Sequence, residues 1–129
     1  MNLSVSSTGE ITDEEIMGFI ATRKEYVFAY YMPGPAPIKD ASARETHQTE
    51  HLRFLFNLKK SGKLALLGPL DEDDHGESFV RCIMIFNTAD KEEVENLLVE
   101  DPLVQYGHFK FTALTFIGTP GDMLEGNRY

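Results

Sequence analysis

The chain of 129 residues has no tryptophan and a single cysteine, Cys82. One cysteine excludes an intrachain disulfide, and with it the small secreted scaffolds that depend on such bridges. Cys82 lies in an apolar run, where a buried inert thiol is expected rather than a nucleophile. We therefore expect a protein of a reducing compartment, the cytoplasm.

Positive charge is also scarce, because 12 Lys and Arg stand against 21 Asp and Glu, which gives a formal net charge of -9. This balance argues against nucleic acid as a partner, since phosphate binding needs clustered Lys and Arg. It argues equally against docking on an anionic membrane surface. The sequence has neither an apolar run of membrane-spanning length nor the start of a signal peptide. We expect a small-molecule substrate.

Several motifs of well-known enzyme classes are missing as well. There is no Gly-rich phosphate loop, no nucleophile elbow and no dinucleotide fingerprint. The length suits one domain with a single core. We expect an N-terminal tail and extra helix over 1–24, an α+β domain over 25–117, and a C-terminal tail over 118–129.

Aromatic and β-branched runs bounded by Gly and Pro turns predict four strands. They are expected over 25–32, 63–67, 79–86 and 107–117. A long helix is expected between the first two strands, from a cap at Ser42 to a stop at Gly62. A second helix is expected from a cap at Thr88 to about residue 99.

An additional helix is expected at 12–23, where Thr12 and Glu15 have the spacing of a capping box. The remaining order, β-α-β-β-α-β, is the ferredoxin-like arrangement of an antiparallel sheet with two helices on one face. Because the strands are apolar on both faces, the face away from the helices needs a cover. We expect a homodimer, in which two sheets face each other across a barrel-like core.

The long helix carries a histidine on its apolar side. At about 100° per residue, His51 falls near the middle of the apolar arc, and His47, one turn earlier, falls toward its edge. The arc itself is formed by Leu52, Phe54, Leu55, Phe56 and Leu58. Both imidazoles should therefore point toward the sheet.

The second helix shows the same anomaly, since Asp101 continues the inward stripe of Val94, Leu97 and Leu98. A carboxylate aimed at a core is costly unless it has a partner. A nearby imidazole would favour the charged forms of both groups, and such a histidine can exchange protons near neutral pH. His51 and Asp101 are therefore candidate catalytic residues, whose contact the topology permits.

Other interpretations of these residues remain open. His51 could be a satisfied structural residue, and Asp101 could simply bond backbone amides in an Asp-Pro turn. His47 and His51, four residues apart, could bind a metal on one helix face. No second histidine pair supports a metal, because His75 and His108 are isolated from each other and from these two histidines. We expect no metal and no cofactor.

Three short motifs occur in order: His51-Leu52-x-x-Leu55, Gly68-Pro69 and Asp101-Pro102-x-Val104-x-x-Gly107. In this the chain resembles the YCII-related (YciI-like) family over about residues 25–117. The resemblance implies a dimeric α+β barrel and a catalytic dyad that falls on His51 and Asp101. Related barrels include isomerases of muconolactone-type substrates, and family members have been linked to chloride elimination from chlorinated hydroxyhydroquinones.

The resemblance and the residues together suggest a cofactor-free lyase or isomerase. It would act by His/Asp general acid-base catalysis on a small cyclic or aromatic-derived compound, such as a chlorinated hydroquinone or a lactone. Candidate substrate-binding residues, for an anionic or phenolic group, are His47, Tyr30 and Arg44. The alternative is a non-catalytic small-ligand-binding or accessory protein of the same family.

Overall fold

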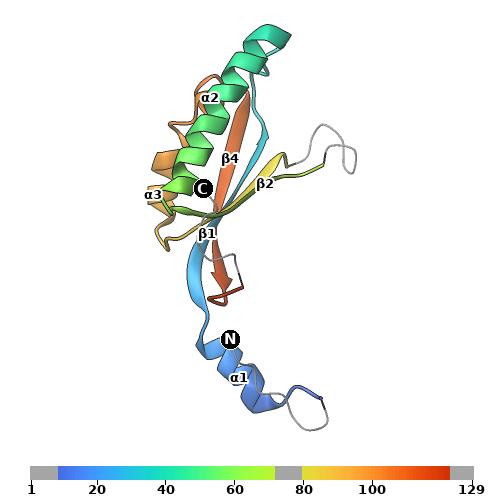
Figure 1. The fold of residues 1–129 in the computed structure, drawn as a ribbon, viewed down its shortest axis with the longest axis vertical. Helices are drawn as coiled ribbons and strands as arrows, with labels where there is room; N and C mark the ends of the chain where they lie inside the picture. The colour runs from blue at the N-terminus through green and yellow to red at the C-terminus, as the bar shows by residue number, and fades with distance from the viewer. Residues whose placement is uncertain (1–8, 72–79, 123–129) are drawn as a thin grey trace.

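The computed structural model describes residues 9–71 and 80–122. Its strands form a four-stranded antiparallel sheet in the order β2-β3-β1-β4. They are β1 (Lys24–Pro33), β2 (Leu64–Pro69), β3 (Cys82–Phe86) and β4 (Phe109–Gly118). The helices α2 (Ala41–Lys60) and α3 (Lys91–Leu98) cover one face of this sheet (Figure 1). The predicted ferredoxin-like α+β fold is confirmed.

Side chains on β1 alternate between the two faces of the sheet. Val27, Ala29 and Tyr31 are buried against the helices, whereas Phe28 and Tyr30 belong to the opposite face. The core between the sheet and the helices also takes buried side chains from β2, β3 and the helices: Leu55, Leu58, Leu64, Met84, Phe86, Val94 and Leu98. Burial of this apolar area is the main driving force that holds α2 and α3 on the sheet.

The long helix α2 begins two residues earlier than a cap at Ser42 would allow. Asp40 is the N-cap, with extended backbone, and its carboxylate accepts a hydrogen bond of 2.8 Å from the Ala43 backbone N–H. The prediction for Ser42 is therefore wrong, because the extended cap backbone is at Asp40 and Ser42 lies inside the helix. At the other end Gly62, with φ of +85°, follows the helix and allows the turn into β2, as expected.

Helix α3 corrects the second predicted cap in the same way. Asp90, not Thr88, caps the helix and accepts from the Glu93 backbone N–H at 3.2 Å. The Thr88 hydroxyl instead accepts from the Asp90 N–H and donates to the Glu93 carboxylate. Thr88 therefore holds the cap in place without being the cap.

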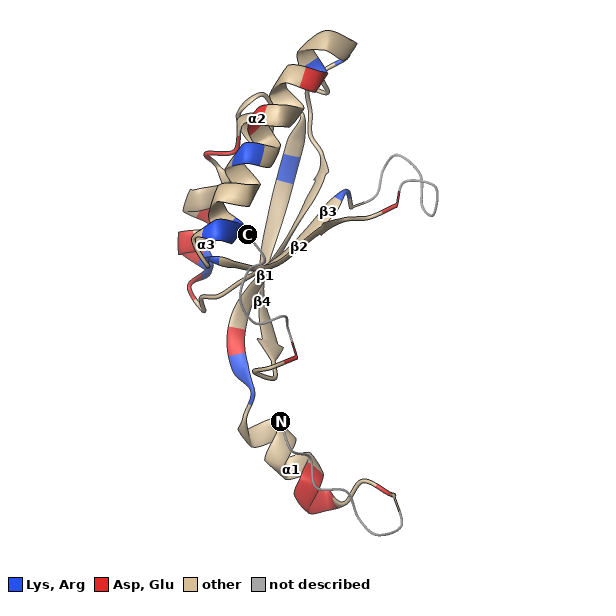
Figure 2. Ribbon diagram, viewed as in Figure 1, with Lys and Arg blue, Asp and Glu red and all other residues tan. Residues whose placement is uncertain are grey.

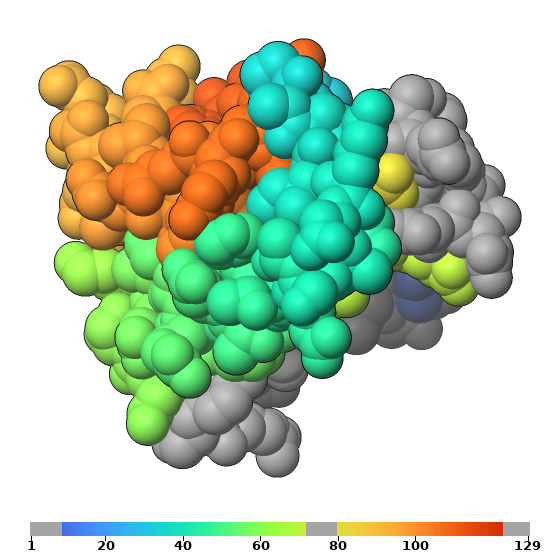
Figure 3. All heavy atoms as spheres, turned by 90° about the horizontal axis from the view of Figure 1, so that it is seen from above, coloured from blue at the N-terminus to red at the C-terminus, as the bar shows by residue number. Residues whose placement is uncertain are grey.

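A short helix that the sequence did not predict, α4 (Pro102–Gln105), follows α3 directly. Asp101 is its N-cap and Pro102 its first residue, a position where the missing N–H of proline has no cost. Seen from above, the segment that includes α4 (orange) lies against α2 (green to cyan), and the two helices are in contact (Figure 3). This contact brings the end of the α3 region to the middle of α2.

The expected N-terminal helix is present as α1 (Asp13–Ala21), and Thr12 is its N-cap, as predicted. It stands apart from the layer of α2 and α3, buries none of its residues, and is acidic in its first turn (Figure 2). Among the strands, β3 begins at Cys82 rather than at Phe79, and Phe79 lies outside the described residues. No helix within 9–71 or 80–122 has the length and apolar character needed to cross a membrane.

Candidate functional site

His51 and Asp101 meet beneath α2. The Nδ1 atom of His51 lies 2.7 Å from Oδ2 of Asp101, and their side chains are 4% and 0% exposed. His51 comes from the buried side of α2, and Asp101 from the junction of α3 and α4. The packing of α4 on α2 thus closes a separation of 50 residues into one hydrogen bond.

The buried carboxylate of Asp101 has three hydrogen-bond partners. Oδ2 accepts from His51 and also from the Tyr31 hydroxyl at 2.5 Å, while Oδ1 accepts from the Leu103 backbone N–H at 2.9 Å. The free-energy cost of removing a carboxylate from water is offset only when such hydrogen-bond partners are present. Asp101 is therefore both the cap of α4 and the centre of a buried polar cluster, which we call the Asp101 cluster (Tyr31, His51, Asp101).

Tyr31 keeps its proton in this cluster. Burial raises the pKa of its phenol far above the ordinary value, and the charge of Asp101 and their hydrogen bond raise it further. The Tyr31 hydroxyl and the Leu103 amide therefore both donate to Asp101, whose carboxylate acts only as an acceptor. His51 must then also donate from Nδ1, and its neutral ring carries an unprotonated Nε2.

Aromatic rings fix the orientation of the His51 imidazole. It makes edge contacts with Tyr31 and Phe109, each with ring centroids 5.5 Å apart, and these two rings stack on each other at 5.4 Å. A ring held by packing and by one strong hydrogen bond has little freedom to flip. Its second nitrogen is therefore presented in one direction.

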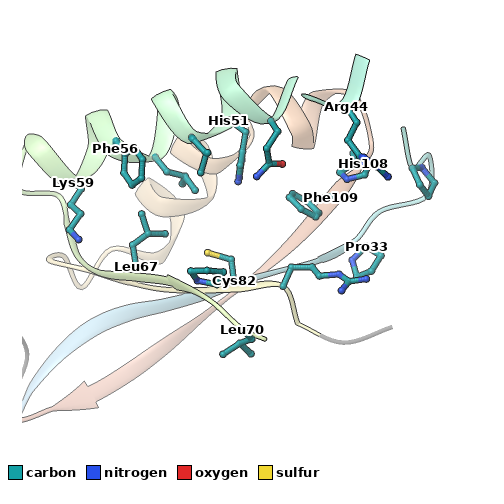
Figure 4. Close-up of a pocket in the computed structure, with 16 residues that line it drawn as sticks. Pro33, Arg44, His51, Phe56, Lys59, Leu67, Leu70, Cys82, His108 and Phe109 are labelled. Carbon is teal, nitrogen blue, oxygen red and sulfur yellow. The ribbon is translucent and has the colours of Figure 1, made fainter. Parts of the chain in front are cut away.

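That direction is a pocket of about 1010 Å³ between α2 and the sheet, which His51 lines. Figure 4 shows His51 pointing from α2 into it, with Leu67 and Cys82 on the sheet below. Leu52 and Phe56, predicted to face inward, line the same pocket and remain 38% and 40% exposed. Part of the apolar side of α2 therefore faces the open pocket instead of the packed core.

Cys82, on the floor of the pocket, is a neutral thiol at physiological pH. Burial raises its pKa to about 11, and the charge of Asp101 adds to this effect. A thiol in this state is a poor nucleophile. The geometry agrees with the inert role expected for Cys82 from the sequence.

The other end of the pocket gathers basic groups from three elements. Arg44 comes from the first turns of α2, Arg81 immediately precedes β3, and His108 immediately precedes β4. His108 accepts a hydrogen bond of 2.9 Å at Nδ1 from the Ile38 backbone N–H. Burial lowers the pKa of His108, and the nearby guanidinium groups of Arg44 and Arg81 lower it further.

Two of the predicted substrate-binding residues lie elsewhere. His47 packs against Tyr106, with ring centroids 3.9 Å apart and the rings tilted, and does not line the pocket. Its position at the edge of the apolar arc turns it toward α4. Tyr30 is on the opposite face of the sheet because its neighbour Tyr31 faces the helices. Only Arg44 of the three lines the pocket that contains His51.

Sequence reasoning missed three residues of the site. Tyr31 could have been found, since a tyrosine hydroxyl in a strand buried on both faces needs a partner. Arg81 and His108 gave no such signal, because each is an isolated residue just before a strand. Within 9–71 and 80–122 no group of three or more His, Cys, Asp or Glu side chains could hold a metal ion.

Comparison with known proteins gives one family. The model of the YCII-related domain matches residues 25–115. No curated protein sequence matches the chain. A similar solved structure is 5-chloro-2-hydroxyhydroquinone dehydrochlorinase from Burkholderia phenoliruptrix AC1100, in complex with 2,5-dihydroxybenzoquinone. It has 19% identity and a TM-score of 0.44, and the match covers 70% of this chain and 90% of that one. A likeness at this level carries nothing about activity.

Proposed function

The chain belongs to the YCII-related family, and from that premise and the pocket at His51 we propose a cofactor-free enzyme that uses His51 as general acid-base. The observation that carries the proposal is the 2.7 Å contact between His51 Nδ1 and Asp101 Oδ2. It leaves Nε2 free to take a proton from a substrate in the pocket. General acid-base catalysis by a positioned histidine contributes about 10²–10⁴-fold to a rate.

The roles of the cluster follow from its hydrogen bonds. When Nε2 takes a proton, the imidazolium that forms is stabilised by the Asp101 carboxylate next to Nδ1. Tyr31 and the Leu103 amide hold this carboxylate in place by donating to it. They are positioning groups, since neither lines the pocket. His51 then returns the proton to the product or to water.

We propose a lyase or isomerase reaction on a small cyclic or aromatic-derived compound, such as a chlorinated hydroquinone or a lactone. The apolar wall formed by Leu52, Leu55, Phe56 and Leu67 suits the face of a ring. In a chloride elimination His51 takes the proton and chloride leaves with the bonding electron pair, so the net loss is HCl. In a lactone isomerisation the proton is removed from one carbon and returned to another. Neither balance needs an oxidant or a cofactor.

Turnover of a substrate panel tests this proposal. Chlorinated hydroxyhydroquinones are assayed by chloride release, and unsaturated lactones by loss of ultraviolet absorbance. We expect His51→Gln to lower turnover by about 10²-fold or more. His47→Gln, one turn away on the same helix and outside the pocket, should retain it. Equal turnover by wild type and His51→Gln would remove the proposed base, and binding without turnover would favour the ligand-binding alternative.

We also propose that two copies associate through the face of the sheet that α2 and α3 leave uncovered. Phe28 and Tyr30 lie on this face, and Leu114 and Phe116 of β4 on it are 47% and 38% exposed. A row of exposed apolar side chains on a four-stranded sheet is typical of an interface. A homodimer of this kind would make a closed, barrel-like core. The single buried Cys82 supports a location in the reducing cytoplasm.

A further inference from the structure

The charge of the pocket is opposite to the charge of the chain. The whole sequence has 21 acidic and 12 basic residues. Yet the described residues that line the pocket include Arg44, Lys59 and Arg81 and no aspartate or glutamate. The Asp101 carboxylate lies behind His51, does not line the pocket, and already accepts three hydrogen bonds. In a chain of net charge -9, this segregation indicates a site for an anion.

His108 shows what kind of group this end of the pocket offers. Because its Nδ1 accepts from the Ile38 amide, the proton of the neutral ring is on Nε2. The lowered pKa of His108 keeps the ring neutral at physiological pH. A neutral imidazole with this tautomer is a hydrogen-bond donor on its free side. It cannot act there as a base, but it can donate to an anionic oxygen.

The backbone around His108 is built to hold this ring still. The Pro-rich loop after β1 is bonded to the start of β4 at 2.7 Å, from Gly34 N–H to the His108 carbonyl, and at 2.9 Å, from Ala36 N–H to the Gly107 carbonyl. The backbones approach so closely that a Cβ on Gly34 would lie 2.2 Å from the Gly107 oxygen. The Ile38 hydrogen bond to the ring extends the same ladder. A preorganised donor of this kind favours binding over a flexible one.

From these observations we propose that Arg44, Arg81 and the Nε2–H of His108 form an anion-binding subsite. It would hold a carboxylate or phenolate of the substrate while the reacting part of the molecule lies at His51. Figure 4 shows Arg44 and His108 together at one end of the pocket and Lys59 at the opposite end. His51 lies between these two ends. Only the reaction at His51 rests on the proposed function. The subsite itself predicts that the pocket binds anionic ligands more tightly than neutral ones.

Calorimetric titration with benzoate and with its neutral analogue benzamide tests the subsite. Wild type should bind benzoate about tenfold or more tightly than benzamide, because charge-assisted hydrogen bonds are the stronger ones. Arg81→Gln should lower benzoate affinity about tenfold, and Arg44→Gln by a smaller factor, since Arg44 is more exposed. Benzamide affinity should not change. His108→Ala should weaken benzoate binding, and His108→Gln, which restores an N–H donor, should recover part of it.

The matched control is Arg53→Gln, which removes the same charge from the exposed side of the same helix. It should leave benzoate affinity unchanged. Equal affinity for benzoate and benzamide, undetectable benzoate binding, or losses in Arg44→Gln and Arg81→Gln no larger than in Arg53→Gln would each overturn the subsite. Arg44 is exposed, so the Arg44→Gln protein tests the proposal even if Arg81→Gln fails to fold.

The same titration on His51→Gln separates this inference from the proposed function. Selective benzoate binding should persist in that variant, because the subsite does not use His51. Persistent selectivity together with unchanged turnover in His51→Gln would retain the subsite and remove the proposed base. Lost turnover in His51→Gln, without any selectivity for benzoate, would retain the proposed base and remove the subsite.

Discussion

Tyr30 and Tyr31 are neighbours in the sequence and lie on opposite faces of the sheet. Tyr31 is fully buried under the helices, and its hydroxyl donates to Asp101. Tyr30 shares its face with Leu114 and Phe116, which are exposed in the single chain. The helix-covered face therefore meets its polar and apolar requirements within one chain, whereas the opposite face leaves apolar side chains exposed. The candidate site lies on the helix-covered face, where the Asp101 carboxylate is enclosed.

The strongest test of the covered face is Asp101→Ala. It leaves the buried Tyr31 hydroxyl and His51 ring without their acceptor and also removes the cap of α4. We expect the free energy of unfolding to fall by about 3–5 kcal/mol, as when one partner of a buried ionic cluster is removed. Urea denaturation followed by circular dichroism measures it. The control is Asp90→Ala, an exposed helix cap, for which about 1 kcal/mol is expected; equal losses would contradict the cluster.

A milder test compares the two tyrosines directly. Tyr31→Phe removes one hydrogen bond to a charged group and should lower the free energy of unfolding by about 2 kcal/mol. Tyr30→Phe, on the opposite face, should change it by less than about 0.5 kcal/mol. The same denaturation experiment measures both. If the two variants lose the same amount, the asymmetry between the faces is not energetic.

The opposite face is tested by its association. Leu114→Glu places a charge in the proposed interface and should raise the dissociation constant of the homodimer by about tenfold or more. Val99→Glu introduces the same charge at an equally exposed apolar residue, 47% exposed, away from this face. It should leave association unchanged. Light scattering after size exclusion over a dilution series gives the dissociation constant, and a monomeric wild type or an unchanged dissociation constant in Leu114→Glu would refute the interface.

The smallest expected effect concerns pH. The pKa of His108 is lowered from its ordinary value of 6.5, first by burial and then by Arg44 and the other nearby positive groups. The unfolded chain therefore binds this proton at higher pH than the folded one, so stability is fully present above about 6.5 and falls as the pH decreases below it. His108→Gln should flatten the stability profile between about pH 7 and 5. A variant whose profile is as steep as that of wild type would contradict this role.

The fold was predictable because its signals are local and agree with one another. Alternation and turn residues define the strands, and the wheel of α2 places His51 on its inner side. Asp101 was recognised as an anomaly, a carboxylate where an apolar residue belongs. The sequence has no clear signal for the short helix α4. Its packing on α2 sets the distance between His51 and Asp101. Its signature, Asp followed by Pro, also fits a simple turn.

The errors have physical reasons of the same kind. Ser42 and Thr88 are good caps, but Asp40 and Asp90 are near competitors, and backbone geometry decided between them. His47 lies one turn from His51, yet a small rotation at the edge of the arc turns it to Tyr106. Arg81 and His108 enter the pocket only through the way their strands pair. No periodicity in the sequence records such placement.

The central claim is that Asp101 holds His51 in one tautomer, with Nε2 unprotonated and facing the pocket. Long-range ¹H–¹⁵N NMR of the four histidines, assigned with His51→Gln and recorded at a pH where the ring is neutral, measures it directly. The expected result is a protonated Nδ1 and a bare Nε2 in wild type, with this preference lost in Asp101→Ala. An Nε2-protonated ring, or the averaged signals of a free imidazole, would contradict the claim.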